Sequence, residues 1–503
     1  MPSIYFTSDH DQFRDALRGF LAKEVDPIAW EKGKRIPPEI WTKMGNLGYL
    51  GICYPETWGG SDADIFYSAV FLEEISRMGL GGFSAAVGVQ EYMATAHIAK
   101  FGSYHLKQGY LAPSIAGEKV GALAISEPDV GSDVANLQCR ALREGDFYRV
   151  NGSKTFITNG VDGHFATVAV RTGEEGSAGV SLLVMDQGLP GFSSSRLDKM
   201  GWHCSDTGLL TFDNVMVPAS HLIGKENMGF YYIMECFQLE RLVAALTALG
   251  GAEACLEMTL KYIKQREAFG RPVARFQVIR HRLADLACEL EAARQLTYHA
   301  CWLYDQNIHA VKECSMAKLK ATELGKIIAD ECLQCYGGYG FMEEYPIARM
   351  YRDARAGTIV GGTTEIMKEI IAKIMVDDVQ YQAPSHAAQG TQSKEVLHSP
   401  DQIFASLPQR YTGPKDLAMI VHFDFQEDDH GAYTVKLQNG TCSVWKGLED
   451  DAHCRVVSPG NLYRDIELGK ISPEAAFMGG KIKVTDPPLM LQFMGAFKKL
   501  PKT

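Results

Sequence analysis

The sequence predicts a multidomain α+β protein. Along its 503 residues the spacing of apolar side chains changes from about 3.6 residues to 2 and back, as expected for a helical domain, a β domain and a second helical domain in succession. A polar segment then interrupts the pattern, and a new mixture of strands and helices begins. The predicted divisions are 1–119 (helical), 120–227 (β), 228–379 (helical), 380–400 (linker) and 401–503 (α+β).

The N-terminal part is predicted to be helical because its apolar residues recur at the helical period. Phe13, Leu17 and Leu21 follow this spacing in one segment, and Phe71 and Ile75 follow it in another. Clusters of Gly and Pro between these segments mark turns.

The middle part is predicted to consist of short strands, at a density that suggests a β-barrel. Strand-like runs occupy 148–150, 155–157, 166–171, 180–185 and 209–217. The dipeptide Asn151-Gly152 separates the first two runs. Because Asn-Gly suits the positive φ angles of a type I′ turn, we expect a hairpin there.

The third part is predicted to be a helical bundle because its apolar stripes are long. One stripe extends from Leu283 to Leu303, about six helical turns, and residues 316–336 show a similar one. Helices of this length with short connections are typical of bundles.

Residues 401–503 are predicted to form a separate α+β domain behind a flexible linker. Strands are expected at 420–425, 432–437 and 441–445, and helices around 461–468 and 489–500. Asn439-Gly440, between the last two strands, is again a hairpin signal. A segment of this length can contain its own hydrophobic core.

Composition argues against several functional classes. The formal charge of −11 argues against nucleic-acid binding, which normally requires a basic domain or stripe. The N-terminus shows no secretory signal, and no uninterrupted apolar stretch approaches the ~20 residues of a membrane span, so we expect a cytoplasmic protein without a transmembrane segment. The 12 cysteines form no disulfide framework and no zinc pattern. Cys332 and Cys335 are therefore expected to be packed thiols, and no metal site is predicted.

Four segments combine residue types that suit a phosphorylated ligand, although each also has a purely structural explanation. Residues 126–133 (SEPDVGSD) can form a surface turn. Residues 265–270 (QREAFG) contain an Arg beside a Gly turn, and Arg pairs bidentately with phosphate. For this segment alone, a helix-ending turn with an exposed Arg is the preferred explanation. Residues 334–340 (QCYGGYG) end a helix and residues 361–364 (GGTT) precede one, so helix capping explains both as well as ligand binding does.

The order and spacing of these segments resemble one family. Residues 1–378 are similar to the acyl-CoA dehydrogenases, and the resemblance depends on 126–133, 156–158 (FIT), 265–277, 333–340, 351–355 (YRDAR) and 362–366 (GTTEI). It implies an α-domain, a β-barrel and a four-helix bundle. It also implies FAD as cofactor, an acyl-CoA substrate and an electron-transfer flavoprotein as electron acceptor. Because the family shares its flavin site between subunits, a homodimer or homotetramer is expected.

The resemblance also assigns residues to the cofactor. Ser126 and Thr158 would lie beside the isoalloxazine ring, in a pocket shaped by Ile125, Gly131, Ser132, Phe156 and Ile157. The adenosine diphosphate half would be held, across a subunit interface, by Arg266, Phe269, Gln277, Gln334, Gly337 and Gly338. Thr363 and Glu365 would flank the cofactor on its far side. The acyl-CoA would be approached by Ser132, Gln238, Arg241, Gly361 and Gly362.

The catalytic base is expected at Glu240. Removal of the α-proton of an acyl-CoA requires a carboxylate in a dry pocket, where desolvation raises its pKa toward neutrality. Many members of the family carry a Glu directly before the G-T loop, but this chain has Gly361 there. Residues 237–242 (FQLERL) instead resemble the long-chain and isovaleryl-CoA branches, which place the Glu before this Arg. The alternatives are Glu365, whose expected role is to complement the charge of a helix N-terminus, and a solvated, non-catalytic Glu240.

Residues 401–500 resemble the sterol carrier protein 2 (SCP2) lipid-binding domain. The resemblance depends on the strand pattern around 438–440 (QNG) and on 465–470 (DIELGK) and 475–482 (AAFMGGKI). It implies an apolar cavity for an acyl chain, an acyl-CoA or a sterol. Candidate lining residues are Phe477, Met478, Leu489, Met490, Phe493 and Phe497. Ordinary core packing is the simpler explanation for each of them.

Together these interpretations predict FAD-dependent α,β-dehydrogenation of a fatty acyl-CoA, medium- to long-chain or branched, to the trans-2-enoyl-CoA. The SCP2-like tail would deliver or store the substrate. Two alternatives stay open. An acyl-CoA oxidase would pass the electrons to oxygen, and a catalytically inactive flavin- and lipid-binding protein would depend mainly on its tail.

Overall fold

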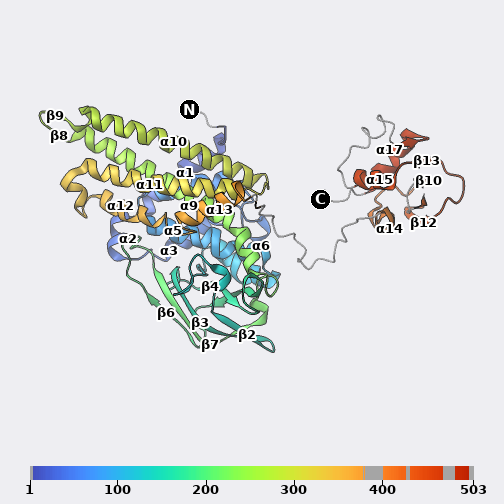
Figure 1. Cartoon of the computed structure of the whole chain (residues 1–503), viewed down its shortest axis with the longest axis horizontal. Coiled ribbons are helices and arrows are strands. Elements are labelled where there is room, and N and C mark those ends of the chain that lie inside the picture. Colours follow the sequence, from blue (N-terminus) through green and yellow to red (C-terminus); the bar gives the residue numbers. More distant parts are fainter. Residues whose placement is uncertain (1–3, 378, 380–399, 426–430, 468–481, 498–503) are drawn as a thin grey trace. The chain divides into compact units, whose positions relative to one another are not determined.

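The computed structural model describes residues 4–377, 379, 400–425, 431–467 and 482–497 (Figure 1). The chain divides into two compact units, Met1–Gln389 and Gly390–Thr503. All 12 cysteines are free of disulfide bonds, as the sequence predicted.

The first unit begins with a set of helices that confirms the predicted helical period. They are α1 (Ser8–Glu24), α2 (Pro27–Gly33), α3 (Glu39–Asn46), α4 (Ile65–Arg77), α5 (Gly81–Val89), α6 (Thr95–Phe101), α7 (Tyr104–Leu106) and α8 (Ala112–Ile115). A π-helical turn at Gln90–Ala94 joins α5 to α6. α4 is buried on all sides from Ile65 to Ser76 apart from Tyr67, so the other elements of the unit pack around it.

A bent sheet follows, and it confirms the β-rich middle part. Its strands are β1 (Gly121–Ala124), β2 (Arg140–Glu144), β3 (Phe147–Thr158), β4 (Phe165–Arg171), β5 (Val180–Asp186), β6 (Phe192–Arg196) and β7 (Thr207–Pro218). The hydrogen-bonded order is β1-β4-β2-β3-β7-β6, and β5 pairs with β4. Among the described strands no pairing joins β6 to β1, so the ladder of hydrogen bonds is not closed into a ring.

The hairpin predicted at Asn151-Gly152 is wrong. β3 continues through both residues, and the chain reverses instead between β2 and β3, where Glu144 pairs with Phe147. The backbone N–H of Asn214 on β7 donates to Asn151 Oδ1 at 2.9 Å, at a bulge where the β3–β7 register shifts. Gly152 has a φ of +143°, and a Cβ there would lie 2.8 Å from the Cα of Cys139. Gly152 is therefore needed for the bulge and for the close approach of Cys139 to β3.

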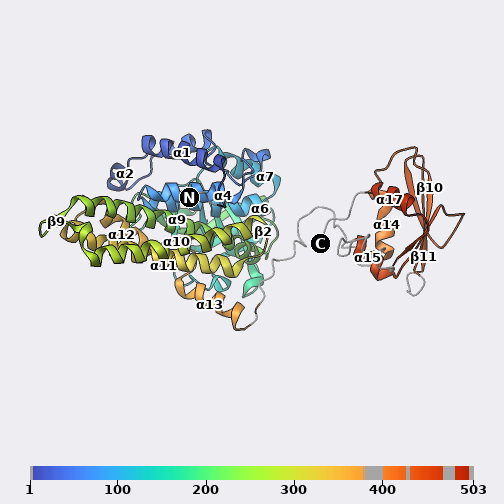
Figure 2. The same cartoon turned by 90° about the horizontal axis from the view of Figure 1, so that it is seen from above.

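The helical bundle begins with the longest helix of the described chain. Its helices are α9 (Gly229–Gln265), α10 (Gln277–Asp305), α11 (Val311–Tyr336), α12 (Pro346–Ala356) and α13 (Thr364–Met375). A short hairpin of β8 (Glu267–Ala268) and β9 (Arg271–Pro272) connects α9 to α10. Figures 1 and 2 show α9, α10 and α11 side by side, with this hairpin at one end of the bundle.

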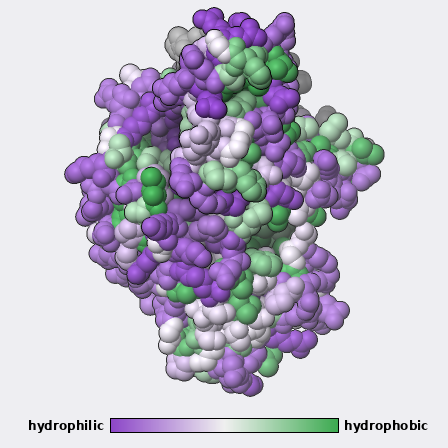
Figure 3. Space-filling view, turned by 90° about the vertical axis from the view of Figure 1, so that its left-hand side faces the viewer, coloured by the Kyte–Doolittle hydropathy of each residue, from purple (hydrophilic) through white to green (hydrophobic). Residues whose placement is uncertain are grey.

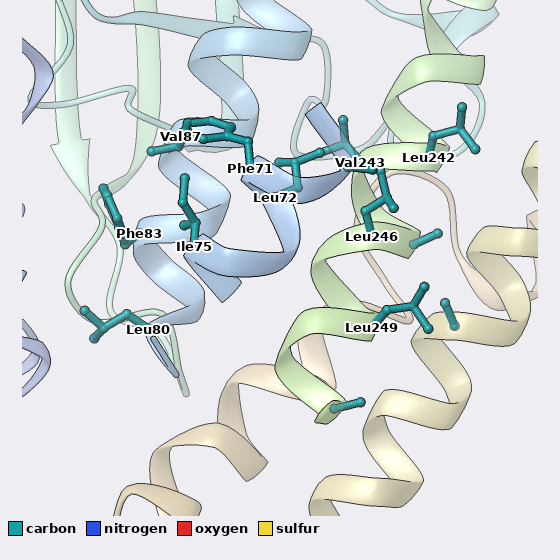
Figure 4. Close-up of a cluster of buried hydrophobic side chains, with 14 of the residues drawn as sticks. Phe71, Leu72, Ile75, Leu80, Phe83, Val87, Leu242, Val243, Leu246 and Leu249 are labelled. Atoms are coloured by element: carbon teal, nitrogen blue, oxygen red, sulfur yellow. The ribbon is translucent and has the colours of Figure 1, made fainter. Parts of the chain in front are cut away.

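α9 is held in place by apolar packing against α4 and α5 (Figure 4). Leu242, Val243, Leu246 and Leu249 of α9 face Phe71, Leu72 and Ile75 of α4, and Leu80, Phe83 and Val87 lie beyond on the α5 side. Among the described helices α9 alone is long and apolar enough to span a membrane, but 56% of its most apolar window is buried in this unit. Packing within the bundle therefore explains its apolar composition.

The second unit is an α+β domain. It contains α14 (Pro400–Arg410), β10 (Met419–Asp424), β11 (Ala432–Gln438), β12 (Thr441–Lys446), β13 (Cys454–Val457), α15 (Gly460–Glu467), β14 (Lys483–Val484) and α17 (Pro487–Gly495). The strand order is β12-β11-β10-β13-β14. The hairpin predicted at Asn439-Gly440 is confirmed, because Gln438 pairs with Thr441 and both turn residues have positive φ.

The candidate lining residues of the tail take part in its core as far as the structure describes them. Phe493 and Phe497 are buried, and Leu489 and Met490 pack against the same cluster. Phe477, Met478 and most of the predicted linker, 380–399, lie outside the described residues. α14, which begins at Pro400, was not predicted.

Candidate active site

The first group of predicted site residues is brought together where β1 and β3 end. The backbone N–H of Thr155 donates to the carbonyl of Ser126 at 2.9 Å, which joins the turn after β1 to β3. Ile125, Ser126 and Thr158 are half-buried there, and Ile157 is buried. Gly131 and Ser132 lie in the exposed part of the same turn.

Phe156 stands out in this group because its backbone is strained. Its φ is +62°, and 72% of its surface is exposed, although the neighbouring residues of β3 are buried. The pairing of β3 with β7 shifts between Lys154 and Ile157, so Phe156 lies in a bulge. A non-glycine residue in this conformation costs of the order of 1 kcal/mol or more, and such strain is concentrated at functional sites. The bulge thus leaves an aromatic ring accessible at the surface.

The second group lies at the end of the bundle that carries the β8–β9 hairpin. A cavity of about 560 Å³ is lined there by Arg266, Gln334, Gly337 and Gly338, together with the aromatic rings of Tyr262, Tyr336 and Tyr339. Gly337 has a φ of +58° directly after α11, and a Cβ added at Gly337 or Gly338 would meet no atom within 4 Å. The backbone is therefore open to a ligand at these glycines.

Phe269 and Gln277 lie near this cavity but do not line it. Phe269, in the β8–β9 turn, has a φ of +52° and is 95% exposed. Gln277 is exposed at the first turn of α10. Figure 3, which views the molecule from this end, shows apolar side chains scattered among polar ones. An aromatic ring as exposed as that of Phe269 is available to a second molecule.

The third group centres on Glu240 of α9. Glu240 is 4% exposed, and its Oε1 atom has no hydrogen-bond partner among the described residues. Burial raises the pKa of this carboxyl to about 8, and the positive charge of Arg241 opposes that shift only in part. Glu240 is thus a desolvated carboxyl whose pKa is close to neutrality.

The loop between α12 and α13 approaches the same region through Lys318 of α11. Lys318 has no exposed surface, and its ammonium group donates to the carbonyl of Gly362. Burial, opposed by the charge of Glu323 and assisted by that of Arg241, lowers the pKa of Lys318 to about 8. The structure thereby brings Arg241 and the Gly361-Gly362 loop together around Lys318.

Three further residues of this group are engaged within the protein. Gln238 Oε1 accepts from the backbone N–H of Ala310 at 2.9 Å, so its amide holds the start of α11. Thr363 caps α13, since its Oγ1 accepts from the N–H of Ile366 at 3.3 Å. Glu365 is exposed in the first turn of α13, where hydrogen bonding to its own backbone N–H lowers its pKa. An exposed carboxylate with a lowered pKa is a poor base. The position of Glu365 suits the role expected for it, which is to complement the charge of a helix N-terminus.

The first and third groups approach α5 from two sides. Asn159, one residue beyond β3, donates from Nδ2 to the carbonyl of Ala86 on α5 at 2.9 Å. A Cβ added at Gly88 of α5 would lie 3.3 Å from Val243 of α9. The second group is remote, because Glu240 and Gln265 are 25 residues apart in α9 and therefore about 37 Å apart along the helix.

Sequence reasoning missed several buried charged residues near these groups. Lys154, Lys318 and Asp353 are all less than 9% exposed. The carboxylate of Asp353 accepts from the N–H groups of Trp202 at 2.6 Å and Gly81 at 3.0 Å, so it joins α12 to the β6–β7 loop and to α5. Asp353 belongs to the YRDAR segment, so the family resemblance could have pointed to it. No local sequence pattern distinguished Lys154 and Lys318 from ordinary surface lysines.

These residues fit the FAD that the sequence resemblance implies. The exposed ring of Phe156 lies on the strand that Thr155 joins to Ser126, so an aromatic ring and the turn at 125–126 are both available to an isoalloxazine ring. The cavity beside Gly337 offers the Arg266 guanidinium to phosphate and open backbone to the nucleotide. Both parts of a dinucleotide therefore have suitable surroundings, at two separate places on the chain.

Family models match nearly the whole chain. Those of the acyl-CoA dehydrogenase N-terminal, middle and C-terminal domains match residues 7–118, 122–215 and 227–376. The model of the SCP-2 sterol transfer family matches residues 402–498.

Individual relatives agree with these matches. Long-chain specific acyl-CoA dehydrogenase of Mus musculus is 39% identical over 379 residues, which cover 74% of this chain and 88% of that protein. Isovaleryl-CoA dehydrogenase of Solanum tuberosum is 36% identical over 378 residues, which cover 74% and 91%.

Solved structures give the same result. The acyl-CoA dehydrogenase of Geobacillus kaustophilus has a TM-score of 0.72 and 42% identity, over 74% of this chain and 99% of that one. The glutaryl-CoA dehydrogenase of Mycobacterium smegmatis in complex with FADH2 has a TM-score of 0.71 and 28% identity, over 75% and 97%. A chain described as electron transferring flavoprotein of Acidaminococcus fermentans has a TM-score of 0.72 and 34% identity, over 75% and 100%. The chain therefore belongs to the acyl-CoA dehydrogenase family of FAD-dependent oxidoreductases and carries a C-terminal SCP2 lipid-binding domain.

Proposed function

We propose that Glu240 is the base that removes the α-proton of a medium- to long-chain or branched fatty acyl-CoA, which leaves as the trans-2-enoyl-CoA. The observation that carries this proposal is the buried, unpartnered Oε1 of Glu240, on a carboxyl whose pKa burial raises to about 8. A desolvated carboxyl is costly to maintain unless it has a function, and a pKa near the working pH makes a base efficient. Many members of the family carry the base at the position of Gly361. This chain has a glycine there, so no carboxylate at that position competes with Glu240 for the role.

The Gly361-Gly362 loop is proposed to orient the thioester. Both residues have positive φ, and Lys318 holds the carbonyl of Gly362, so the direction of the neighbouring N–H groups is fixed. A fixed N–H that faces the thioester carbonyl stabilises the charge that develops there as the α-proton leaves. Bound FAD supplies the acceptor for the hydride that leaves the β-carbon.

We also propose that two chains share each flavin site, in a homodimer or a homotetramer. The cavity at Arg266 lies about 37 Å along α9 from Glu240, which is farther than one extended dinucleotide reaches. Phe269, 95% exposed at the same end, is placed to contact a second chain. One FAD molecule can use both places only if they belong to different subunits.

The SCP2 domain is proposed to hold acyl chains or acyl-CoA for the dehydrogenase unit. A tether of about 20 residues would keep its ligand at roughly millimolar effective concentration. An electron-transfer flavoprotein is the proposed electron acceptor. If oxygen were the acceptor instead, the protein would be an acyl-CoA oxidase.

The first experiment is anaerobic bleaching of flavin absorbance by a panel of straight and branched saturated acyl-CoAs. The wild type should bleach, Glu240→Gln should retain flavin but fail to bleach, and Glu73→Gln should bleach normally. Glu73 is a matched control because it is a buried carboxyl of α4 that accepts from Tyr298 at 2.7 Å. It packs against Gly250 of α9, about 15 Å along the helix from Glu240. A folded, flavin-loaded Glu240→Gln protein that bleaches at the wild-type rate would refute the assignment. Re-oxidation by oxygen with release of peroxide would identify the oxidase.

The role of the tail is tested by removing residues 390–503. The shortened chain should fold, because the Geobacillus protein is matched over 99% of its length without such a tail. Slower turnover of dilute long-chain acyl-CoA by the shortened chain would support delivery or storage. Equal kinetics of the two chains would contradict it.

A further inference from the structure

Glu127 and Lys154 form a buried ion pair between two segments that face the proposed flavin site. Lys154, on β3, has no exposed surface, and Glu127, in the turn after β1, is 6% exposed. Lys154 Nζ lies 2.8 Å from Glu127 Oε1. Neither residue was among the predicted cofactor or substrate contacts.

Both members of the pair also make hydrogen bonds to the backbone. Lys154 Nζ also donates to the carbonyl of Ile125 at 2.9 Å. Glu127 Oε1 accepts from the N–H of Cys139 at 2.9 Å, and Oε2 accepts from the N–H of Gln138 at 2.6 Å. The two side chains thus connect β3, the turn at 125–130 and the chain that enters β2.

The position of the pair along β3 indicates what it does. Lys154 directly precedes the bulge that presents Phe156 at a φ of +62°. Thr155, between them, donates its N–H to the carbonyl of Ser126. A strained conformation persists only where its surroundings over-determine it. The bonds of Lys154 and Thr155 to Ile125 and Ser126 provide this constraint on one side of the bulge.

Stability alone is a weak reason for such a pair. Burying two charges carries a large desolvation cost, and apolar residues of similar volume often stabilise a fold as well or better. Geometric specificity is the better explanation. A buried ion pair that also bonds to the backbone on both sides favours one register between the segments it joins.

We propose that the Glu127–Lys154 ion pair is a positioning device of the flavin site. It fixes residues 125–126 relative to the bulge at Phe156, so that FAD meets both surfaces in one arrangement. The inference deepens the proposed function, because it rests on the placement of FAD against these two segments. Glu127 and Lys154 act through the backbone they hold and are positioning residues.

The test uses the full chain, stripped of FAD and titrated with FAD while quenching of flavin fluorescence is followed. Thermal unfolding of the apoprotein is measured separately. Lys154→Met leaves Glu127 buried without its cation, and it should lower the apoprotein Tm and raise the FAD dissociation constant about tenfold or more. The double variant Glu127→Gln/Lys154→Met has no uncompensated charge. It should recover much of the Tm but not the FAD affinity.

The control separates stability from positioning. Glu73→Ala leaves the buried hydroxyl of Tyr298, which donates to Glu73 Oε1 at 2.7 Å, without its acceptor. This variant should lower the Tm while FAD binds as tightly as to the wild type. Wild-type FAD affinity in Lys154→Met, or recovery of both Tm and affinity in the double variant, would overturn the inference. A wild-type protein that binds no FAD would overturn the proposed function itself.

Discussion

Lys318 of α11 donates a hydrogen bond to the carbonyl of Gly362, so a fully buried lysine holds the loop between α12 and α13. Gly361 and Gly362 have φ values of +63° and +91°, which glycine adopts without strain. The charge of Arg241, the neighbour of Glu240, also acts on Lys318. One side chain therefore couples the loop to the surroundings of the proposed base.

Replacing Lys318 by Met should slow catalysis more than it weakens cofactor binding. Without the hydrogen bond, the N–H groups of the loop lose their fixed direction, and loss of an oriented donor typically costs about 100-fold in rate. The measurement is stopped-flow flavin reduction by a good acyl-CoA substrate, with the flavin content of the variant determined first. An unchanged reduction rate in the flavin-loaded variant would show that the loop needs no such support.

Flavin reduction should depend on pH through Glu240. The carboxyl must be ionised to accept a proton, and its pKa is raised to about 8 by burial. The rate should therefore rise with pH toward a plateau above this pKa, and fall about tenfold for each pH unit well below it. Anaerobic reduction rates across the neutral range provide the test. A pH-independent rate over this range would contradict the role of Glu240.

Glu240→Gln should stabilise the protein at alkaline pH. The folded-state pKa of about 8 exceeds the unfolded value of 4.5, so the folded state binds the extra proton between these limits. Wild-type stability contributed by this group is thus present below pH 4.5 and is lost as pH rises through the folded pKa. Glu240→Gln has no such titrating group. Its unfolding free energy relative to that of the wild type should therefore increase as pH rises from 4.5 to about 8. Denaturant unfolding of both proteins at acidic and alkaline pH measures it, and a gain that does not change with pH would refute the buried, titrating carboxyl.

Asp353→Asn should destabilise the first unit. The Asp353 carboxylate accepts from the N–H groups of both Trp202 and Gly81, whereas an amide has one acceptor oxygen. One buried N–H then loses its partner, at a cost of about 1–3 kcal/mol. Asp330→Asn, on an exposed site of α11, is the control and should change the unfolding free energy little. Equal stability of the two variants would argue that water replaces the lost acceptor.

Gly152→Ala should be more harmful than Gly145→Ala. Both glycines have positive φ, but a Cβ at Gly152 would lie 2.8 Å from the Cα of Cys139, whereas a Cβ at Gly145 would meet no atom within 4 Å. Gly145→Ala should cost about 1 kcal/mol of backbone strain, and Gly152→Ala should cost more because β2 and β3 must also separate. Thermal unfolding of both variants compares them. Similar losses would mean that strand separation costs little.

The sequence by itself determined the features of this protein that depend on residues close together in the chain. The helical period of α1, α4, α10 and α11 and the Asn439-Gly440 hairpin were correct, because helices and tight turns are formed by residues close together in the chain. The order of the glycine and arginine segments was enough to indicate the family, since each segment is local and its spacing is set by the elements between. Glu240 was predicted as the base in the same way, from a short motif and the absence of a carboxylate at Gly361.

Only the tertiary structure decided what depends on partners far along the chain. Asn151-Gly152 has the same composition as a hairpin turn, but β7 and Cys139 approach it and make it part of a bulge. Lys154 and Lys318 look like surface residues in the sequence because their partners lie 27 and 44 residues away. A buried charge is tolerated only where a partner is present, and the partner arrives only when the chain has packed. For that reason the positions of these lysines, and the shape of the site that they hold, could not be predicted from local sequence.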